Sequence, residues 1–293
     1  MIFNVPDKIE LAKLLAVEPR EIDSVLSRIA RYYRPREFPK SSGGIRTLLV
    51  PHGELKDLQL KIKQNILDDV PFLPCVHGGV KRKSIMSNAQ PHVSQAVVFS
   101  LDIENFFPHV DPERVYRIFR DLGFGEEAAR ILVKATTWKY QLPQGTSTST
   151  GLANLSLARA DARISQLARE HGFAYTRFVD DLTLSGGWRL LKFRRLIPRI
   201  IESEGFRIKP EKTMTMDRGT RQVVTKLVVN GKINVSRDRR RAIRKEVLNL
   251  IQGSADICST ASVKGRVHWM HHINPDIGAG LVSRLIVHSD AHR

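Results

Sequence analysis

Residues 174–186 have the sequence AYTRFVDDLTLSG, in which two adjacent acids, Asp180 and Asp181, interrupt an apolar stretch. The β-branched and aromatic residues on either side predict two short strands that meet at the acidic pair. Adjacent carboxylates in apolar surroundings repel each other and resist removal from water, so they need a compensating cation. A solvated turn is the ordinary explanation of an isolated Asp-Asp pair, and a functional site therefore requires a further acid elsewhere in the chain.

Residues 96–107, AVVFSLDIENFF, supply that acid. The apolar run at their start predicts a buried strand that ends near Asp102. Carboxylate oxygens suit Mg²⁺, a hard cation that keeps room for water and phosphate oxygens. Two such ions, roughly 3.5–4 Å apart, activate an attacking hydroxyl and stabilise the leaving oxygen of a phosphoryl displacement. We therefore predict a site for two magnesium ions at Asp102, Asp180 and Asp181.

The composition favours a nucleic-acid partner. The 293 residues carry a net charge of +17, which self-repels unless a polyanion neutralises it. An anionic membrane surface is the alternative, but no long helix with one basic face is apparent. The N-terminus lacks the features of a signal peptide, no apolar run approaches ~18 residues, and Cys75 and Cys258 form no paired motif. We expect a cytoplasmic protein without a membrane partner.

The order of predicted elements favours an α+β fold. Helices are expected at the N-terminus, over 54–69, over 111–137 and from Ser236 onward, and residues 35–47 predict a loop or hairpin tip. The dipeptide Asn230-Gly231 predicts a hairpin turn. Strand-ending carboxylates separated by helices suggest a palm-like sheet rather than a doubly wound parallel one. Neither GxGxxG nor GxxxxGK[ST] occurs in the chain.

Five motifs in order, spread over about residues 40–275, resemble those of reverse transcriptases. They are GGIRTLLVP for the fingers, VVFSLDIENFF and LPQGTSTSTGLANL for the first palm motifs, FVDD for the catalytic hairpin, and GFRIKPEKT with the basic region after it for the later palm motifs. The resemblance implies a right-hand polymerase, α+β, with fingers, an antiparallel palm sheet with helices, and a short helical thumb. The implied division is an N-terminal helical segment over 1–35, fingers over 36–97, a palm over 98–235 with fingers-associated helices at about 111–140, and a thumb over 236–293.

Among reverse transcriptases, the sequence is most similar to bacterial retron enzymes. The stretch from Asn88 to His92, NAQPH, matches their N-A-x-x-H element. Asn88 and His92 are expected to bind RNA, with a structural hydrogen-bonding role as the alternative. The stretch VVTKL resembles their V-T-G element, with Lys226 where the family has Gly. Phe178 replaces the usual Tyr of the catalytic hairpin, which removes only a hydroxyl.

The resemblance also implies roles at the catalytic centre. Asp102 and Asp180 would bind both ions, Asp181 would be a third carboxylate, and the Ile103 carbonyl an additional ligand. The ring of Phe107 would exclude a 2′-hydroxyl and so select dNTPs, whereas Phe106 is expected in the core.

Further residues are expected around the nucleotide. Gln144 and Gly145 would line the pocket near the sugar and base, where a glycine lets the backbone approach closely. Arg46 would bind the triphosphate with its guanidinium fork. Lys212 would lie near the phosphates. A solvated surface cation is the alternative for both Arg46 and Lys212.

A dense run of cations follows the palm motifs. Neutralisation of backbone phosphates by such a helix gives salt-dependent, largely sequence-independent affinity, and an RNA–DNA hybrid would be recognised mostly by its shape. The residues expected to bind RNA here are Arg237, Arg239, Arg240, Arg241, Arg244 and Lys245.

The resemblance implies an RNA-directed DNA polymerase of a retron. It would copy a structured noncoding RNA, start from the 2′-hydroxyl of an internal guanosine, and make RNA-linked single-stranded DNA (msDNA). Its partners would be that RNA, the RNA–DNA hybrid product, dNTPs and an effector protein in antiphage defence. The alternatives are another bacterial reverse transcriptase, of the group II intron, diversity-generating or other defence type, and a non-catalytic RNA-binding scaffold with a relic palm.

Overall fold

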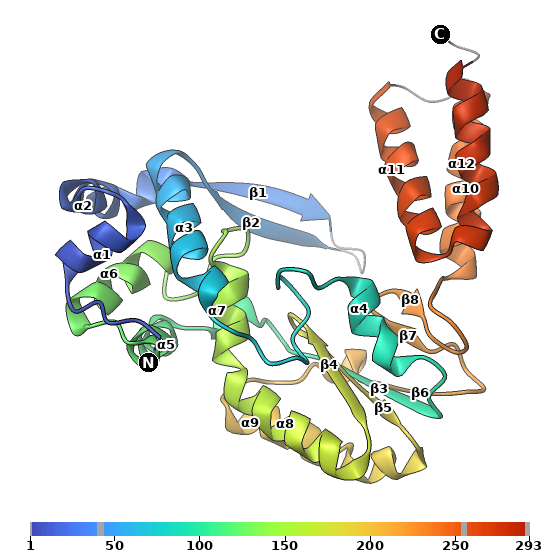
Figure 1. The fold of residues 1–293 in the computed structure, drawn as a ribbon, viewed down its shortest axis with the longest axis horizontal. Coiled ribbons are helices and arrows are strands. Elements are labelled where there is room, and N and C mark those ends of the chain that lie inside the picture. The colour runs from blue at the N-terminus through green and yellow to red at the C-terminus, as the bar shows by residue number, and fades with distance from the viewer. Residues whose placement is uncertain (1, 40–43, 253–256, 291–293) are drawn as a thin grey trace.

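The structure is a computed structural model that describes residues 2–39, 44–252 and 257–290 (Figure 1). Its α-helices are α1 (Lys8–Leu15), α2 (Pro19–Ser27), α3 (Gly53–Asn65), α4 (Ile85–Ala89), α5 (Pro112–Leu122), α6 (Glu126–Thr136), α7 (Ser149–Ser156), α8 (Ala158–His171), α9 (Leu196–Ser203), α10 (Arg237–Ile251), α11 (Ile257–Ile273) and α12 (Pro275–Asp290). Its 3₁₀ helices are η1 (Ile29–Tyr32), η2 (Leu67–Asp69), η3 (Gln90–His92), η4 (Phe107–His109), η5 (Trp188–Phe193) and η6 (Pro210–Lys212). Its strands are β1 (Tyr33–Pro39), β2 (Ile45–Pro51), β3 (Val97–Asp102), β4 (Ala174–Phe178), β5 (Asp181–Gly186), β6 (Met214–Asp217), β7 (Val223–Val224), β8 (Leu227–Val228) and β9 (Asn234–Val235).

A four-stranded antiparallel sheet of order β4-β5-β3-β6 forms the centre of the molecule. Strand β3 is interior to the sheet and buried on both faces, which is why its sequence is a continuous apolar run. Because side chains alternate between the faces of a strand, Phe99 and Leu101 join the large core with α5, α8 and α9. Val98 joins a second core that includes Met216 and residues of α10 and α11. The predicted α+β architecture is confirmed.

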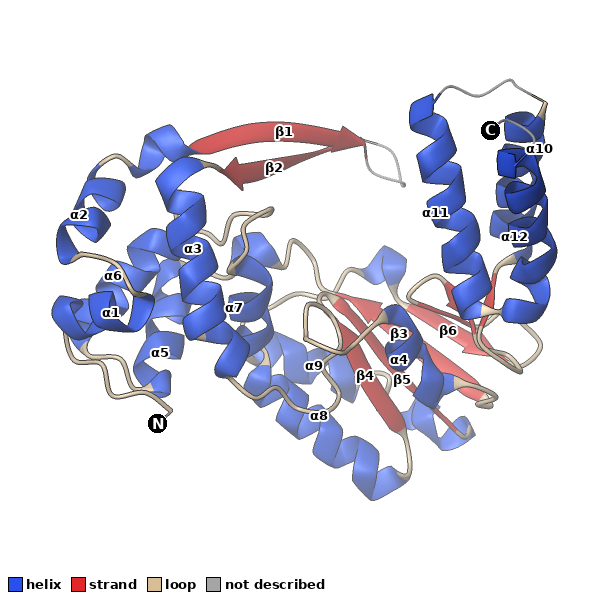
Figure 2. Ribbon diagram, turned by 45° about the horizontal axis from the view of Figure 1, so that its top comes forward, coloured by secondary structure: helices blue, strands red, loops and turns tan. Residues whose placement is uncertain are grey.

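The N-terminal helices α1, α2 and α3 pack with α6 beside a long antiparallel hairpin of β1 and β2 (Figure 2). The pairing runs from Tyr33 opposite Pro51 to Pro39 opposite Ile45. The loop predicted over 35–47 is therefore shorter than expected, since residues 33–39 are strand. Residues 40–43 lie outside the described part of the chain.

The small sheet β7-β8-β9 leads into the helices α10, α11 and α12, which pack against one another. In both ribbon views these helices and the β1–β2 hairpin stand on the same side of the central sheet. The predicted hairpin turn at Asn230-Gly231 is confirmed, because these residues lie in the loop that connects the antiparallel strands β8 and β9, although this loop is longer than two residues. A tighter turn of two residues, Thr225-Lys226, connects β7 to β8, and the φ angles of these residues are +45° and +68°. None of the helices in the described ranges has both the length and the apolar composition that a membrane crossing requires.

Candidate active site

Two antiparallel strands bring the predicted acids together. Asp102 ends β3 and lies directly opposite Asp181, the first residue of β5. Asp180 lies in the two-residue connection between β4 and β5, and its carbonyl accepts a hydrogen bond from the Ile103 N–H at 3.0 Å. Asp102 and Asp181, which are 79 positions apart in the sequence, are therefore neighbours at one end of the sheet, as the two strand predictions required.

The connection between β4 and β5 has an unusual backbone. Val179 has a φ of +61°, a left-handed conformation that disfavours a β-branched residue. Gly78 lies against this residue so closely that an added Cβ would be 2.5 Å from the Val179 nitrogen. Because Gly78 has no Cβ, its backbone can lie directly against that of Val179 and so support the strained turn.

A buried arginine supports the same turn from inside the fold. Arg177, on β4, is fully buried, and its Nη1 donates to the Val179 carbonyl at 2.8 Å. The same nitrogen donates to Asn154 Oδ1 on α7, and Nη2 donates to Asp161 Oδ2 on α8 at 2.6 Å. Tyr175 also donates to Asp161, at 2.7 Å. Arg177 thus connects the β4–β5 turn by hydrogen bonds to both α7 and α8.

The site concentrates negative charge in a poorly hydrated position. Asp102 is 6% exposed, and the Lys212 ammonium lies 2.6 Å from its Oδ2. Burial, together with the charges of Asp180 and Asp102, raises the pKa of the Asp181 carboxyl to about 6. The hydrogen bond to Asp102 raises the pKa of Lys212. These shifts have the signs expected where three carboxylates compete for too little positive charge.

The carboxylate oxygens of Asp102, Asp180 and Asp181 are ligands that a hard cation prefers, although these side chains are not arranged around a cation. In the described ranges, no three His, Cys, Asp or Glu side chains form a group that could hold a metal ion. The Lys212 ammonium, which is hydrogen-bonded to Asp102, compensates part of the negative charge of the three carboxylates. A cation that used this oxygen would have to displace Lys212, whose side chain is half exposed.

Phe107 and Phe106 lie just beyond β3 and have different surroundings. Phe106 is buried and makes an edge contact with Phe206, with 5.3 Å between ring centroids, so its predicted core position is confirmed. Phe107 begins η4 and is only partly buried, packed at 5.8 Å against the ring of Phe106. Its ring is thus available at the surface a few residues from Asp102.

The loop before α7 packs against the β1–β2 hairpin. The carbonyl of Gln144 accepts a hydrogen bond from the Leu49 N–H at 2.8 Å. Gly145 has a φ of +108°, and an added Cβ would lie 3.3 Å from the Leu49 carbonyl oxygen. Arg46 lies on β2, opposite Phe38, and its side chain is outside the described part of the structure. The backbone therefore joins the two segments in which the nucleotide contacts are predicted.

Of the two roles expected for Asn88 and His92, the structure favours the structural one over contact with RNA. Both side chains are buried in the protein, where RNA cannot reach them. His92 Nε2 lies 2.8 Å from Thr176 Oγ1, whose own hydrogen is donated to the Asn88 carbonyl, and Nδ1 lies 2.6 Å from Ser185 Oγ. Nε2 is therefore the donor and Nδ1 the acceptor of a neutral imidazole. Burial, with a smaller effect from His77, lowers the pKa of His92 to about 3. We assign both residues a structural role.

Asn88 connects α4 to the β7–β8 turn. Its Nδ2 donates to Thr225 Oγ1 at 3.4 Å, and that hydroxyl donates to the Ile85 carbonyl at 3.3 Å. The turn that contains Lys226 is therefore fixed against the helix, and Lys226 itself is exposed. The positive charge of Lys226 opposes the rise in the Asp181 pKa, so this side chain acts electrostatically on Asp181.

The predicted cations of the helical tail lie on the first three turns of α10. Ile243 and Val247 form the buried side of the helix, while Arg240 is half buried and the other five cations are exposed. Within the described residues none of the six forms an ion pair with a carboxylate. Their charge is available to an anionic partner on the side of the sheet that also carries the β1–β2 hairpin.

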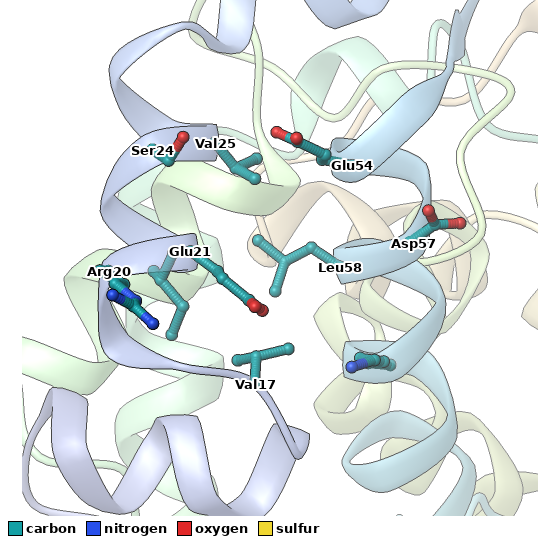
Figure 3. Close-up of a pocket in the computed structure, with 10 residues that line it drawn as sticks. Val17, Arg20, Glu21, Ser24, Val25, Glu54, Asp57 and Leu58 are labelled. Carbon is teal, nitrogen blue, oxygen red and sulfur yellow. The ribbon is translucent and has the colours of Figure 1, made fainter.

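A pocket of about 520 Å³ lies elsewhere, between α2 and α3 (Figure 3). The side chains of Glu21 and Leu58 point into the space between these helices, with Arg20 and Asp57 on its two sides. None of the predicted site residues lines this pocket. Its mixed charges define no ligand class.

Sequence reasoning missed Arg177, Asp161, Asn154 and Gly78. An arginine within the apolar strand AYTRFV was a usable signal, because a buried guanidinium requires an acidic partner. Its partner could not be chosen from the sequence, since many acids are available.

The family model described as "Reverse transcriptase (RNA-dependent DNA polymerase)" matches residues 38–234. The chain is 34% identical to the retron Mx65 reverse transcriptase of Myxococcus xanthus, covering 96% of this chain and 74% of that protein. It is 35% identical to the retron Ec86 reverse transcriptase of Escherichia coli, covering 72% of this chain and 67% of that protein.

Among solved structures, a telomerase from Candida albicans, determined with a fragment of telomeric RNA, has a TM-score of 0.51 at 10% identity. The match covers 89% of this chain and 60% of the telomerase chain. At this identity the likeness concerns the fold alone.

Proposed function

The chain belongs to the reverse transcriptase (RNA-dependent DNA polymerase) family and is related to retron enzymes, and from that premise we propose how its residues carry out the reaction. The family reaction is RNA-templated DNA synthesis, in which a primer hydroxyl attacks the α-phosphate of a dNTP and pyrophosphate leaves. The observation that carries our assignment is the pairing of Asp102 with Asp181 next to Asp180. Two Mg²⁺ ions held there by the three carboxylates and the Ile103 carbonyl would supply the charge that activates the hydroxyl and stabilises the leaving oxygen.

The chain's own residues position the reactants. The rigid β4–β5 turn fixes the direction of Asp180 and Asp181, so little reorganisation is needed during the reaction. Lys212, whose Nζ lies 2.6 Å from Asp102 Oδ2, would be available to the triphosphate if a cation occupied that carboxylate. Its ammonium then neutralises phosphate charge as the pyrophosphate departs.

The nucleotide is selected beside these acids. The partly exposed ring of Phe107 packs under the sugar and leaves no room for a 2′-hydroxyl, so dNTPs are accepted and NTPs excluded. The backbone of Gln144 and Gly145, fixed against β2, lines the sugar and base. Arg46, on the same strand, binds the triphosphate with its guanidinium.

The basic part of α10 binds the template–primer duplex. Its exposed arginines neutralise backbone phosphates without a sequence requirement, so binding weakens as salt rises. In this assignment the β1–β2 hairpin belongs to the fingers, the central sheet to the palm, and α10, α11 and α12 to the thumb.

For the biological role we propose a retron. The template is the enzyme's own structured noncoding RNA, the first deoxynucleotide is joined to the 2′-hydroxyl of an internal guanosine, and the product is msDNA. An effector protein cooperates with this complex in antiphage defence. The support is the similarity to the Mx65 and Ec86 retron enzymes over most of the chain.

The catalytic assignment is tested by dNTP incorporation on an RNA template with an annealed DNA primer and Mg²⁺. Asp180→Ala is expected to abolish incorporation, whereas Asp121→Ala, an exposed acid on α5, is expected to leave it unchanged. Equal incorporation by wild type and Asp180→Ala would end the assignment.

The retron assignment requires a separate experiment in the native host. Nucleic acid that copurifies with the wild-type enzyme is sequenced and compared with that from the Asp180→Ala variant. We expect a DNA strand joined to RNA through a 2′-linkage with the wild type only. Free RNA without linked DNA in both preparations would contradict retron priming.

A further inference from the structure

A second basic segment lies outside the catalytic region. Residues 187–199 have the sequence GWRLLKFRRLIPR, and no Asp or Glu occurs between Asp181 and Glu202. All the cations of this segment are exposed. We define the η5–α9 patch as Trp188, Arg189, Lys192, Arg194, Arg195 and Arg199.

The charges of the η5–α9 patch are not neutralised by the protein. Within the described part of the chain, no patch cation forms an ion pair with a carboxylate, although Arg163 on the neighbouring α8 pairs with Glu204 at 3.5 Å. Like charges gathered in this way repel one another, and a polyanion relieves the repulsion. We therefore expect the η5–α9 patch to bind an anionic partner.

Trp188 adds an aromatic surface to these charges. Its side chain is 60% exposed, whereas its neighbour Leu190 is fully buried. Phe193 is also used within the protein, since its ring packs against His171 at 4.5 Å and Phe173 at 5.5 Å. Among the apolar and aromatic side chains of η5, Trp188 is the one that is exposed to solvent. An exposed indole among cations suits the stacking of an unpaired base.

The patch lies far from the catalytic acids. Strand β5 carries Asp181 at one end and leads to Trp188 from the other, and its six residues span on the order of 20 Å. In Figure 1, α8 and α9 lie on the edge of the molecule opposite the β1–β2 hairpin and α10–α12. A nucleic acid on the patch would therefore occupy a surface different from the one assigned to template and primer.

We propose that the η5–α9 patch is a second RNA-binding surface that takes a single-stranded segment of RNA. The cations contact backbone phosphates, and Trp188 stacks on one base. A membrane surface fits less well, because Ile197, Ile200 and Ile201 of α9 are buried in the protein, and the exposed Leu196 alone does not give the helix a continuous apolar face to enter a bilayer. Of the proposed function, this inference requires only that the enzyme binds RNA.

The test uses the full chain and two matched variants. The patch variant changes Arg189, Lys192, Arg194 and Arg195 to Gln. The control variant changes four exposed cations of α5 and α6, Arg117, Arg120, Arg130 and Lys134, to Gln, which gives the same change in net charge. The probe is a labelled RNA hairpin with a single-stranded polyuridine tail, added to enzyme whose catalytic site is saturated with unlabelled template–primer.

The patch variant is expected to bind the tailed hairpin at least roughly tenfold more weakly than wild type and to lower the slope of log K against log salt by about 2 to 3. The control variant is expected to bind like wild type, and both variants should incorporate dNTPs normally on a short template–primer. Equal binding by the patch variant and wild type, or an equal loss in the control variant, would overturn the proposal. So would binding to phosphatidylserine vesicles that depends on the patch while RNA binding does not.

Trp188 is tested separately. Trp188→Ala is expected to weaken binding of the tailed hairpin by about tenfold, and Trp188→Phe to restore most of the affinity, because the stacking surface is retained. Neither change should alter binding of a hairpin without a tail. A loss in Trp188→Ala that Phe does not restore would contradict the stacking role. Failure of wild-type dNTP incorporation would instead refute the proposed function and leave these binding measurements interpretable.

Discussion

The guanidinium of Arg177 and the carboxylate of Asp161 form an ion pair in the protein interior, with 2.6 Å between Nη2 and Oδ2 and at most 1% of either side chain exposed. Arg177 is three residues before Asp180 and also binds the carbonyl of Val179. The pair therefore connects α8 to the turn that presents the catalytic acids. Because both charges are removed from water, removal of one partner leaves the other uncompensated.

We predict that Asp161→Asn lowers the free energy of unfolding by about 3–5 kcal/mol, because it leaves the buried arginine without its counter-charge. Denaturant unfolding measures the change. Glu126→Gln, which removes one partner of the exposed Arg130 pair, should cost less than about 1 kcal/mol. A similar small cost for both substitutions would show that Arg177 finds another partner.

Gly78→Ala is predicted to disturb the catalytic turn, since the new Cβ would lie 2.5 Å from the Val179 backbone nitrogen. Overpacking of this kind costs about 1–3 kcal/mol, and the displaced turn should lower kcat for dNTP incorporation more than it changes KM. Gly231→Ala, where an added Cβ meets no atom within 4 Å, is the control. Unchanged kcat in Gly78→Ala would mean that Val179 moves without carrying Asp180 with it.

His92 is predicted to make the protein less stable in acid. Its folded pKa, about 3, lies below the unfolded value of about 6.5, so the unfolded state binds more protons between these values. Stability is therefore complete above pH 6.5 and is lost as the pH falls toward 3, by up to about 1.4 kcal/mol per pH unit from this group. His92→Gln should flatten the dependence of unfolding free energy on pH in this window. An unchanged slope in that variant, or an equal change in the exposed control His109→Gln, would contradict the assignment.

Lys226→Gly is predicted to stabilise the β7–β8 turn. Lys226 has a φ of +68°, a conformation that costs an L-residue about 1–2 kcal/mol and glycine little. Lys226→Ala removes the charge but keeps the strain, so it should be less stable than Lys226→Gly by about 1 kcal/mol in thermal or denaturant unfolding. Equal stability of the Ala and Gly variants would show that the turn is not strained at this position.

Phe107→Val is predicted to weaken discrimination against ribonucleotides by roughly tenfold or more, because a smaller side chain leaves space for a 2′-hydroxyl. The ratio of kcat/KM for dNTP and NTP incorporation on the same template measures it. Phe106→Val, in the core behind this ring, should lower stability but leave the ratio unchanged. Selection unaffected by Phe107→Val would move the sugar-selective contact to another residue.

Local pattern was sufficient for the strands that bear the acids. The apolar run before Asp102 and the flanks of Asp180 predicted β3, β4 and β5, because a strand buried on both faces needs a continuous apolar sequence. Order in the sequence and resemblance to a family then gave the α+β architecture. The two-residue connection at Val179 and Asp180 followed from the position of the acids between two strands.

The sequence by itself therefore determined which residues form the strand ends and that the surface is strongly basic. Only the tertiary structure decided that Asp161 is the partner of Arg177, that Asn88 and His92 are buried, and that a second tight turn lies at Thr225-Lys226. The physical reason is that burial along one strand follows from local periodicity, whereas a long-range partner depends on how separate layers pack. A polar residue can be satisfied by solvent or by any of many distant groups, and only the packed fold selects one of them.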